Sequence, residues 1–192
     1  MKENKEFKTT DLVFIGVFAA LIAVCSWISI PLPSGIPVTL QTMAVCIICA
    51  VGGMKRGSAS VLVYILLGII GVPVFSGFKA GISAVAGTTG GYIVGFIFTA
   101  LIAGSVSDAL DKKNCKKPLK FIITVISMIL GIAVCYAFGT AWFAVVYART
   151  NEPAGLGTIL GWCVLPYIIP DLVKIIVAAS IAPTLRKLMK RV

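Results

Sequence analysis

Two charged residues lie inside an otherwise apolar stretch near the C-terminus, and they are the strongest candidates for chemistry. Asp171 and Lys174 are followed by an apolar run to Ile181. Residues three apart are neighbours on one face of a helix. A charge inside a membrane segment costs roughly 2.5–3.5 kcal/mol on insertion scales and usually marks a functional site with a partner. The pair could offer a strong acceptor and a strong donor to a small polar ligand, or it could be a self-satisfied salt bridge that anchors the helix.

The residue before this pair suggests how the carboxylate is stabilised. Asp171 directly follows Pro170, and proline is favoured in the first turn of a helix. The sequence therefore predicts that Asp171 lies near a helix N-terminus. The helix dipole favours a carboxylate at that position.

A second group of polar residues opens an earlier apolar segment. Thr39, Gln41 and Thr42 lie close together at its start. Their hydroxyl and amide groups both donate and accept hydrogen bonds. They could line a water-filled pocket, or they could cap the helix in the headgroup layer, and the sequence leaves both alternatives open.

Catalytic and metal-binding residues are scarce. The sequence contains no histidine, which excludes His-based metal sites and Ser-His or Cys-His catalysis. Cys46 and Cys49 form C-x-x-C in an apolar segment, and we interpret all six scattered cysteines as small buried hydrophobic residues. No Gly-rich loop followed by Lys-Ser/Thr could bind nucleotide phosphates. The prediction is a protein that is not an enzyme and has no catalytic residues, metal site or cofactor, so that any ATP-driven step needs another polypeptide.

The elements that must position these residues are apolar runs of membrane-spanning length. Each has about 15–20 residues, near what a helix rising 1.5 Å per residue needs to cross roughly 30 Å of hydrocarbon. With 59% hydrophobic and 12% charged residues, the composition fits no soluble class. We predict one all-α integral membrane domain over residues 1–192. Its six predicted transmembrane helices are Leu12–Ile30, Val38–Gly53, Ser58–Phe75, Tyr92–Val106, Leu119–Phe138 and Pro166–Leu185.

Lysine and arginine are distributed unevenly between the loops. Fourteen of the seventeen fall on one side of the membrane, and five of them lie in the segment 108–120, which is also suited to anionic lipid headgroups. The opposite side holds only Lys79 and Arg149. The positive-inside rule therefore predicts that both termini are cytoplasmic and that a binding site opens outward. This topology accounts for the net charge of +10 without binding of nucleic acid.

Two outer segments have unusual backbones. Three prolines between positions 31 and 37 forbid a regular helix. Seven glycines between positions 68 and 91 also oppose a continuous helix, although the stretch is too apolar for an exposed loop. Irregular backbone at membrane depth is tolerated only where protein covers it or where it lines a cavity. We predict a glycine-rich lid over an outward pocket, with Lys79 as its only charge.

Small residues recur on the first predicted helix. Ala19 and Ala23 are four apart and overlap a second pair, Gly16 and Ala20. Small residues at this spacing let another helix approach closely in lipid. The face could dock another membrane subunit, or it could pack within the protein. The three tryptophans map to the outer side, either as an aromatic belt or for stacking on a bound ring.

Several of these motifs together resemble the BioY family, the biotin-specific substrate-capture (S) components of energy-coupling factor (ECF) transporters. The resemblance runs through nearly the whole chain. It is carried by Ile36-Pro-Val-Thr-Leu-Gln-Thr42, Gly53-Met-Lys-Arg-Gly57, Tyr64-Ile-Leu-Leu-Gly-Ile-Ile-Gly-Val-Pro-Val-Phe75, Gly87-Thr-Thr-Gly-Gly-Tyr92 and Pro166…Pro170-Asp171-x-x-Lys174.

This resemblance implies a six-helix subunit in a prokaryotic cell membrane that captures biotin from outside. It implies a transmembrane coupling protein and two cytosolic ATPases as partners, docked through helix 1 at Ala19 and Ala23. Asp171 would accept from the ureido N–H groups of biotin, and Lys174 or Lys79 would neutralise its carboxylate. The residues predicted to bind the ligand are Asp171, Lys174, Lys79, Gln41, Thr39, Tyr92 and Gly81.

Three alternatives remain open at this stage. The ligand could be another vitamin, such as thiamine or riboflavin, or a biotin precursor, although two lysines suit the cationic thiamine poorly. The protein could be a solitary facilitator that needs no ATPase. A membrane-embedded enzyme is disfavoured, because Asp108 and Asp111 are predicted to be cytoplasmic and Glu152 stands alone in an outer loop.

Overall fold

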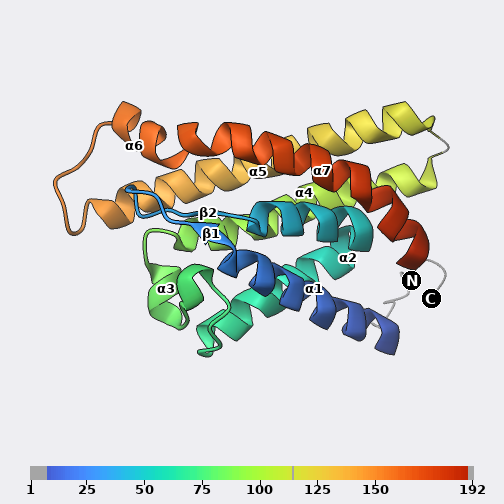
Figure 1. The fold of residues 1–192 in the computed structure, drawn as a ribbon, viewed down its shortest axis with the longest axis horizontal. Helices are drawn as coiled ribbons and strands as arrows, with labels where there is room; N and C mark the ends of the chain where they lie inside the picture. Colours follow the sequence, from blue (N-terminus) through green and yellow to red (C-terminus); the bar gives the residue numbers. More distant parts are fainter. Residues whose placement is uncertain (1–7, 114, 190–192) are drawn as a thin grey trace, which may run out of the picture.

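Long apolar helices form most of the structure, a computed structural model that describes residues 8–113 and 115–189 (Figure 1). Backbone N–H and C=O groups find no partner in lipid, and a helix satisfies nearly all of them internally. The helices are α1 (Thr9–Trp27), α2 (Gln41–Ile69), α3 (Ile82–Ala86), α4 (Gly90–Lys112), α5 (Lys117–Tyr147), α6 (Leu156–Cys163) and α7 (Leu165–Met189). The other elements are β1 (Ser29–Ile30), β2 (Val38–Thr39) and the 3-10 helix η1 (Ser76–Phe78). Within the described residues, five helical segments, with α6 and α7 taken as one, are long and apolar enough to cross a membrane.

Helix α2 consists of two arms that reverse direction at Gly53. The backbone there has φ 71° and ψ −170°, a conformation that residues with a side chain rarely adopt. The reversal brings the Gln41 Nε2 within 2.7 Å of the Tyr64 hydroxyl, to which it donates. The 23 intervening residues would span about 35 Å as a straight helix. The two arms therefore correspond to the predicted second and third segments.

The bounds of these segments differ from the prediction. The second arm begins directly after Gly53, so Lys55 and Arg56 lie in a helical turn and not in a loop. This arm ends at Ile69, before Phe75. Helix α5 has 31 residues and continues beyond Phe138 to its end at Tyr147.

A carboxylate from α4 stabilises the reversal. The Asp108 side chain fills the space beside Gly53, where an added Cβ would lie 2.7 Å from Asp108 Cγ. Asp108 Oδ2 accepts from the Met54 N–H at 2.9 Å, and Oδ1 accepts from Arg186 of α7 at 2.8 Å. Arg186 also donates to the Ala50 carbonyl at 2.6 Å. The arginine therefore ties α7 to both α2 and α4.

The two ends of the bundle differ in composition. Helix α1 begins and helix α7 ends at one end of the bundle, where α4 also ends and α5 begins (Figure 1). We call this the basic end. The strands β1 and β2 and helix α3 lie at the other, which we call the hairpin end (Figure 1). Most of the described lysines and arginines belong to segments at the basic end. Lys79 lies between η1 and α3, and Arg149 follows the end of α5, and both of these segments are at the hairpin end. The remaining basic residues of the two termini fall outside the described residues.

The proline-rich loop is closed by a two-stranded hairpin. Ser29 pairs with Thr39 and Ile30 pairs with Val38 in an antiparallel ladder. The Tyr167 hydroxyl of α7 donates to the carbonyl of Ile36 at 2.5 Å, which fastens the loop to the bundle. The loop is not helical, as its prolines predict.

Helices α6 and α7 meet at Val164, where the backbone leaves helical geometry at φ −125° and ψ −55°. Helix α7 therefore begins at Leu165, and Pro170 lies inside it. The prediction that Pro170 lies in the first turn of its helix is wrong. Asp171 lies in the second turn, so hydrogen bonds from side chains, described below, replace the predicted stabilisation by the helix dipole.

The small residues of α1 fall on two different faces. Ala19 and Ala23 are only 2% and 6% exposed, and they belong to the core in which α1 packs on its neighbours. The prediction that these two alanines dock a partner is therefore corrected, and the internal-packing alternative applies to them. Gly16 and Ala20 are exposed, and a Cβ added at Gly16 would meet nothing within 4 Å.

Candidate ligand-binding site

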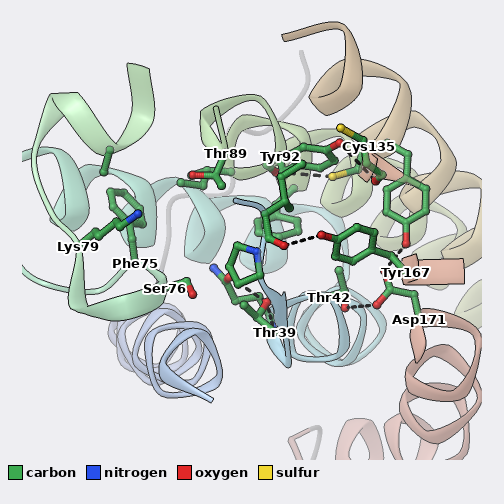
Figure 2. Close-up of a pocket in the computed structure, with 18 of the residues that line it drawn as sticks. Thr39, Thr42, Phe75, Ser76, Lys79, Thr89, Tyr92, Cys135, Tyr167 and Asp171 are labelled. Carbon is green, nitrogen blue, oxygen red and sulfur yellow. Dashed lines mark hydrogen bonds between the residues drawn. The ribbon is translucent and has the colours of Figure 1, made fainter. Parts of the chain in front are cut away.

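A cavity of about 90 Å³ lies near the hairpin end (Figure 2). Its wall combines the junction of β2 and α2, helices α4, α5 and α7, and residues 70–89, which connect α2 to α4 and which we call the glycine-rich segment. Elements far apart in the chain therefore meet at one place. The cavity brings the polar run at positions 39–42 next to Asp171 and Lys174.

Asp171 and Lys174 form a buried ion pair on this wall. Their exposed fractions are 4% and 9%, and Lys174 Nζ lies 2.8 Å from Asp171 Oδ1. The Thr42 hydroxyl donates to the same oxygen at 2.9 Å, and the Tyr136 hydroxyl donates to Oδ2. Lys174 Nζ also donates to the carbonyl of Thr39 at 2.6 Å. Buried charges are tolerated when they are paired and hydrogen-bonded, and this network meets both conditions.

The pair is satisfied internally and also lines the cavity, so both interpretations from the sequence describe part of it. An ionised carboxylate has about four acceptor positions. Lys174, Thr42 and Tyr136 occupy three of those on Asp171. The carboxylate therefore retains capacity for a further donor from the cavity.

The polar run at the start of α2 is similarly connected. The Thr39 hydroxyl donates to Gln41 Oε1 at 3.0 Å and accepts from the Gln41 N–H at 3.3 Å. The Gln41 amide nitrogen donates to Tyr64, which fixes the orientation of the side chain. Thr39, Gln41 and Thr42 all line the cavity. Thr39 thus stabilises the start of the helix and contributes to the wall.

Aromatic residues form much of the remaining wall. Tyr92, Tyr136 and Tyr167 line the cavity together with Phe75 and Phe96. The Tyr92 and Thr140 hydroxyls are hydrogen-bonded at 3.0 Å. Such rings offer a large apolar contact surface with a polar group at the edge.

None of the three tryptophans lines this cavity. Trp27 Nε1 donates to the Pro73 carbonyl at 2.9 Å, and Trp142 Nε1 donates to the Gly87 carbonyl at 3.0 Å. These two indoles therefore fasten the glycine-rich segment at both of its ends. Stacking of a tryptophan on a ligand in this cavity is not supported by the geometry.

Phe75 anchors the middle of the glycine-rich segment. Its side chain is 2% exposed and packs edge-on against Tyr64, with the ring centroids 5.5 Å apart. The ring lies where a Cβ on Gly68 would be, so the second arm of α2 needs a glycine there. Lys79 follows on the same segment and pairs with Phe75 through a backbone bridge.

Lys79 differs from Lys174 in its surroundings. It lines the cavity from the glycine-rich segment and is exposed. Among residues 8–113 and 115–189, no carboxylate lies within 4.0 Å of its Nζ. Lys79 and Asp171 lie on opposite sides of the pocket in the view of Figure 2.

Six of the seven residues predicted to bind a ligand line the cavity. They are Asp171, Lys174, Lys79, Gln41, Thr39 and Tyr92. Gly81 does not line it, and its N–H donates to the Gly68 carbonyl at 2.7 Å, which attaches the glycine-rich segment to α2.

Two tyrosines in the wall are absent from the prediction. Tyr136 is a polar side chain in an apolar segment, and Tyr167 lies four residues before Asp171, on the same helix face. Both features were available as signals in the sequence. Both tyrosines are neutral, whereas Asp171 and Lys174 are conspicuous as charged residues in an apolar segment.

The arrangement suits binding of a small amphipathic molecule. Apolar and aromatic residues form most of the wall, and a few polar groups converge on it, as is typical of ligand sites. Among the residues that the structure describes, no cluster of His, Cys, Asp or Glu could hold a metal ion. Polar groups in such an arrangement can fix the orientation of a ligand.

Comparison with known proteins gives consistent results over nearly the full length of the chain. Residues 1–191 match the model of the BioY family. The chain is 36% identical to the biotin transporter BioY of Thermotoga maritima, covering 93% of this chain and 96% of that one. It is 34% identical to the probable biotin transporter BioY of Pyrococcus horikoshii, covering 93% and 98%. The fold is similar to the crystal structure of the S-component for biotin from an ECF-type ABC transporter, with a TM-score of 0.80, 25% identity and coverage of 97% and 95%.

Proposed function

The chain belongs to the BioY family, and from this premise we propose that it captures biotin at the outer face of a prokaryotic cell membrane as the S-component of an ECF-type ABC transporter. The family's named relatives are transporters and not enzymes. The observation that carries the proposal is the buried Asp171–Lys174 pair in the wall of a mostly apolar cavity. A wall of this composition suits a ligand that combines an apolar ring with strong hydrogen-bonding groups.

The chemistry of biotin matches the two sides of the cavity. Its ureido ring carries two N–H donors, and Asp171 retains capacity to accept from one of them. Its thiophane ring is apolar and suits the aromatic wall. Its valerate chain ends in a carboxylate, which needs a cation. Charge-assisted hydrogen bonds of this kind are roughly twice as strong as neutral ones.

Lys79 is the better partner for the carboxylate of biotin. Lys174 already binds Asp171 at 2.8 Å and the Thr39 carbonyl at 2.6 Å. Lys79 has no carboxylate within ion-pairing distance among the described residues, and it lies across the pocket from Asp171 in Figure 2. We therefore propose Lys79 where the sequence leaves the choice between two lysines open.

The glycine-rich segment acts as a lid in this proposal. At about 90 Å³ the cavity is smaller than the roughly 300–1,000 Å³ typical of small-molecule sites. The segment at residues 70–89 contains no long helix. It is attached to Trp142 by one hydrogen bond, and to Trp27 by one hydrogen bond and the stacking of the indole on Phe78. Displacement of this segment would enlarge the cavity and admit the ligand.

The proposed topology has six spans with both termini cytoplasmic. The reversal at Gly53 divides α2 into two spans, and α6 with α7 forms the last. The basic end then faces the cytoplasm by the positive-inside rule. The cavity, near the hairpin end, opens outward.

The proposed partners are a transmembrane coupling protein and two cytosolic ATPases. The chain needs them for ATP-driven uptake, because it contains no phosphate-binding loop of its own. The corrected docking face on α1 includes Gly16 and Ala20, which are exposed and small. This stripe would allow close contact with a helix of the coupling protein.

Calorimetric titration of the purified, detergent-solubilised protein tests the ligand. We expect tight binding of one biotin per chain, and no binding of thiamine or riboflavin. Absence of biotin binding in a sample that still melts cooperatively would refute the assignment of biotin and leave the family's fold in place. Uptake of biotin by cells that lack every ATPase subunit would instead indicate a solitary facilitator.

The role of Lys79 is tested with a neutral ligand. In biotinamide the carboxylate is replaced by an amide, so its affinity should depend little on a cation. We expect Lys79→Met to weaken the binding of biotin at least about tenfold and that of biotinamide much less, because a hydrogen bond to a charged group contributes about 1.5–3 kcal/mol. Equal losses for both ligands would contradict this role, and Arg149→Met serves as a control for charge at the same end.

A further inference from the structure

A second cavity, of about 460 Å³, opens at the basic end between α4, α5 and α7. It is separate from the biotin site and shares no lining residue with it. Its lining combines four cations and one carboxylate with several apolar side chains. The charged residues are Lys117, Lys120, Arg186, Lys187 and Asp111, and the larger apolar ones are Leu110, Phe121 and Pro183.

Part of this positive charge is already used to build the wall. Arg186 Nε donates to Asp111 Oδ2 at 2.7 Å, and Lys120 Nζ lies 3.6 Å from Asp111 Oδ1. The Arg186 side chain is only 14% exposed, and it also binds Asp108. These contacts hold one side of the cavity in a fixed geometry and leave the site positively charged overall.

Two further cations remain available to a ligand. Lys117, at the start of α5, and Lys187, near the end of α7, both line the cavity and are exposed. In residues 8–113 and 115–189, neither has a carboxylate within 4.0 Å. Two lysines on facing helices can converge on a single anion. A phosphate group suits this arrangement, because its charge is compact and it accepts several hydrogen bonds.

The apolar part of the lining distinguishes a lipid from a free phosphate. Of these lining residues, Leu110 is 6% exposed and Phe121 is 37% exposed. Ile122 and Ile126, further along α5, are 52% and 51% exposed and have the character of a lipid-facing surface. Inorganic phosphate gains nothing from such a wall, but the glycerol and acyl chains of a phospholipid would bury apolar area against it.

We infer that this cavity binds the headgroup of an anionic phospholipid at the membrane boundary. Basic pockets between transmembrane helices on the cytoplasmic side are suited to such headgroups. The inference goes beyond the proposed capture of biotin and does not depend on it. The proposed topology enters only in the choice of leaflet, which would be the cytoplasmic one.

Native mass spectrometry of the full-length protein, titrated with phosphatidylglycerol or phosphatidylcholine, tests this site. We expect phosphatidylglycerol to bind more tightly than phosphatidylcholine. The double variant Lys117→Gln/Lys187→Gln should weaken its binding roughly 30-fold, from about 1 kcal/mol for each lysine near an anionic lipid. The matched control is Lys112→Gln/Lys113→Gln, which removes the same charge outside the cavity and should bind the lipid like the wild type.

Cys115 localises the bound lipid. It lines this cavity, and it is the only one of the six cysteines that is not buried. Maleimide labelling should therefore be several-fold slower in nanodiscs of phosphatidylglycerol than of phosphatidylcholine, and the Lys117→Gln/Lys187→Gln variant should lose this protection.

Three outcomes would overturn the inference. Equal weakening in both double variants would indicate diffuse attraction to the basic end. Displacement of the lipid by millimolar inorganic phosphate would indicate a site for free phosphate. Equal labelling of Cys115 in both kinds of nanodisc would show that the lipid binds elsewhere.

Discussion

At the scale of single residues, Asp171 is defined by the donors that surround it. Thr42, Tyr136 and Lys174 reach it from α2, α5 and within α7. A buried carboxylate with three donors is held in one orientation. The direction of its remaining acceptor position is therefore fixed as well. We expect Asp171→Asn to weaken biotin binding at least tenfold, or about 1.4 kcal/mol, in calorimetric titration. The amide keeps the shape but loses the charge that strengthens the hydrogen bond to the ureido N–H.

The controls for this substitution separate binding from folding. Glu152→Gln makes the same chemical change at an exposed carboxylate and should leave the affinity unchanged. Removing one partner of a buried pair can also destabilise the fold. Thermal melting is therefore measured in parallel, and Asp171→Asn/Lys174→Met removes both charges should the single variant unfold. Wild-type affinity in a folded Asp171→Asn protein would show that the charge of Asp171 does not contribute to biotin binding.

The sequence predicts the charged part of this network better than its neutral part. Asp171 and Lys174 are conspicuous because charges are rare in apolar segments, and their spacing of three makes them neighbours. Thr42 is 129 residues from Asp171 and Tyr136 is 35 residues from it. No local rule connects residues so far apart, because their contact depends on how the helices pack.

At the scale of elements, hydropathy predicts the long helices because lipid leaves the backbone few alternatives. It does not predict where they turn. The reversal at Gly53 needs a glycine with positive φ and the Asp108 side chain from α4. The contact with Asp108 depends on how α2 and α4 pack together, which the local sequence does not reveal. The predicted start of the last span, Pro166, is one residue from the start of α7, but Pro170 is not in the first turn, because a proline inside a helix resembles one at its beginning in the sequence. The glycine-rich segment was recognised from composition, but its attachment points were not.

Gly68 tests how the glycine-rich segment is held. An added Cβ there would overlap the Phe75 ring, so Gly68→Ala must displace the ring that anchors the segment. Alanine is the better helix former by up to about 1 kcal/mol, so the helix itself should not be weakened. We expect biotin to dissociate about tenfold faster in stopped-flow measurements, because changes at a binding site act mainly on the off-rate.

Gly161→Ala is the matched control for this substitution. Gly161 lies in α6, and a Cβ added there would meet nothing within 4 Å. This variant should release biotin at the wild-type rate. An unchanged rate in Gly68→Ala would mean that the packing of Phe75 does not govern the lid.

At the scale of the whole molecule, the two ends of the bundle have separate tasks. The hairpin end carries the cavity proposed to bind biotin, and the basic end carries most of the described lysines and arginines and the proposed lipid site. This polarity follows from the distribution of lysine and arginine, so the sequence alone predicts it. The sequence cannot tell which of the two overlapping small-residue pairs on α1 faces outward, because the direction of each face depends on how α1 packs on α2.

The exposed pair on α1 gives the last prediction. If Gly16 and Ala20 form the contact with the coupling protein, Gly16→Leu/Ala20→Leu should block energised uptake, because large side chains keep the helices apart. Binding of biotin to the isolated protein should be unchanged, since both residues point away from the core. Ala133→Leu/Ala137→Leu is the matched control, as these alanines are also four apart and exposed, but on α5. Transport assays in cells that contain all subunits, together with co-purification of the coupling protein, distinguish the two faces. Normal uptake by the α1 variant, or equal loss in the α5 variant, would place the docking surface elsewhere.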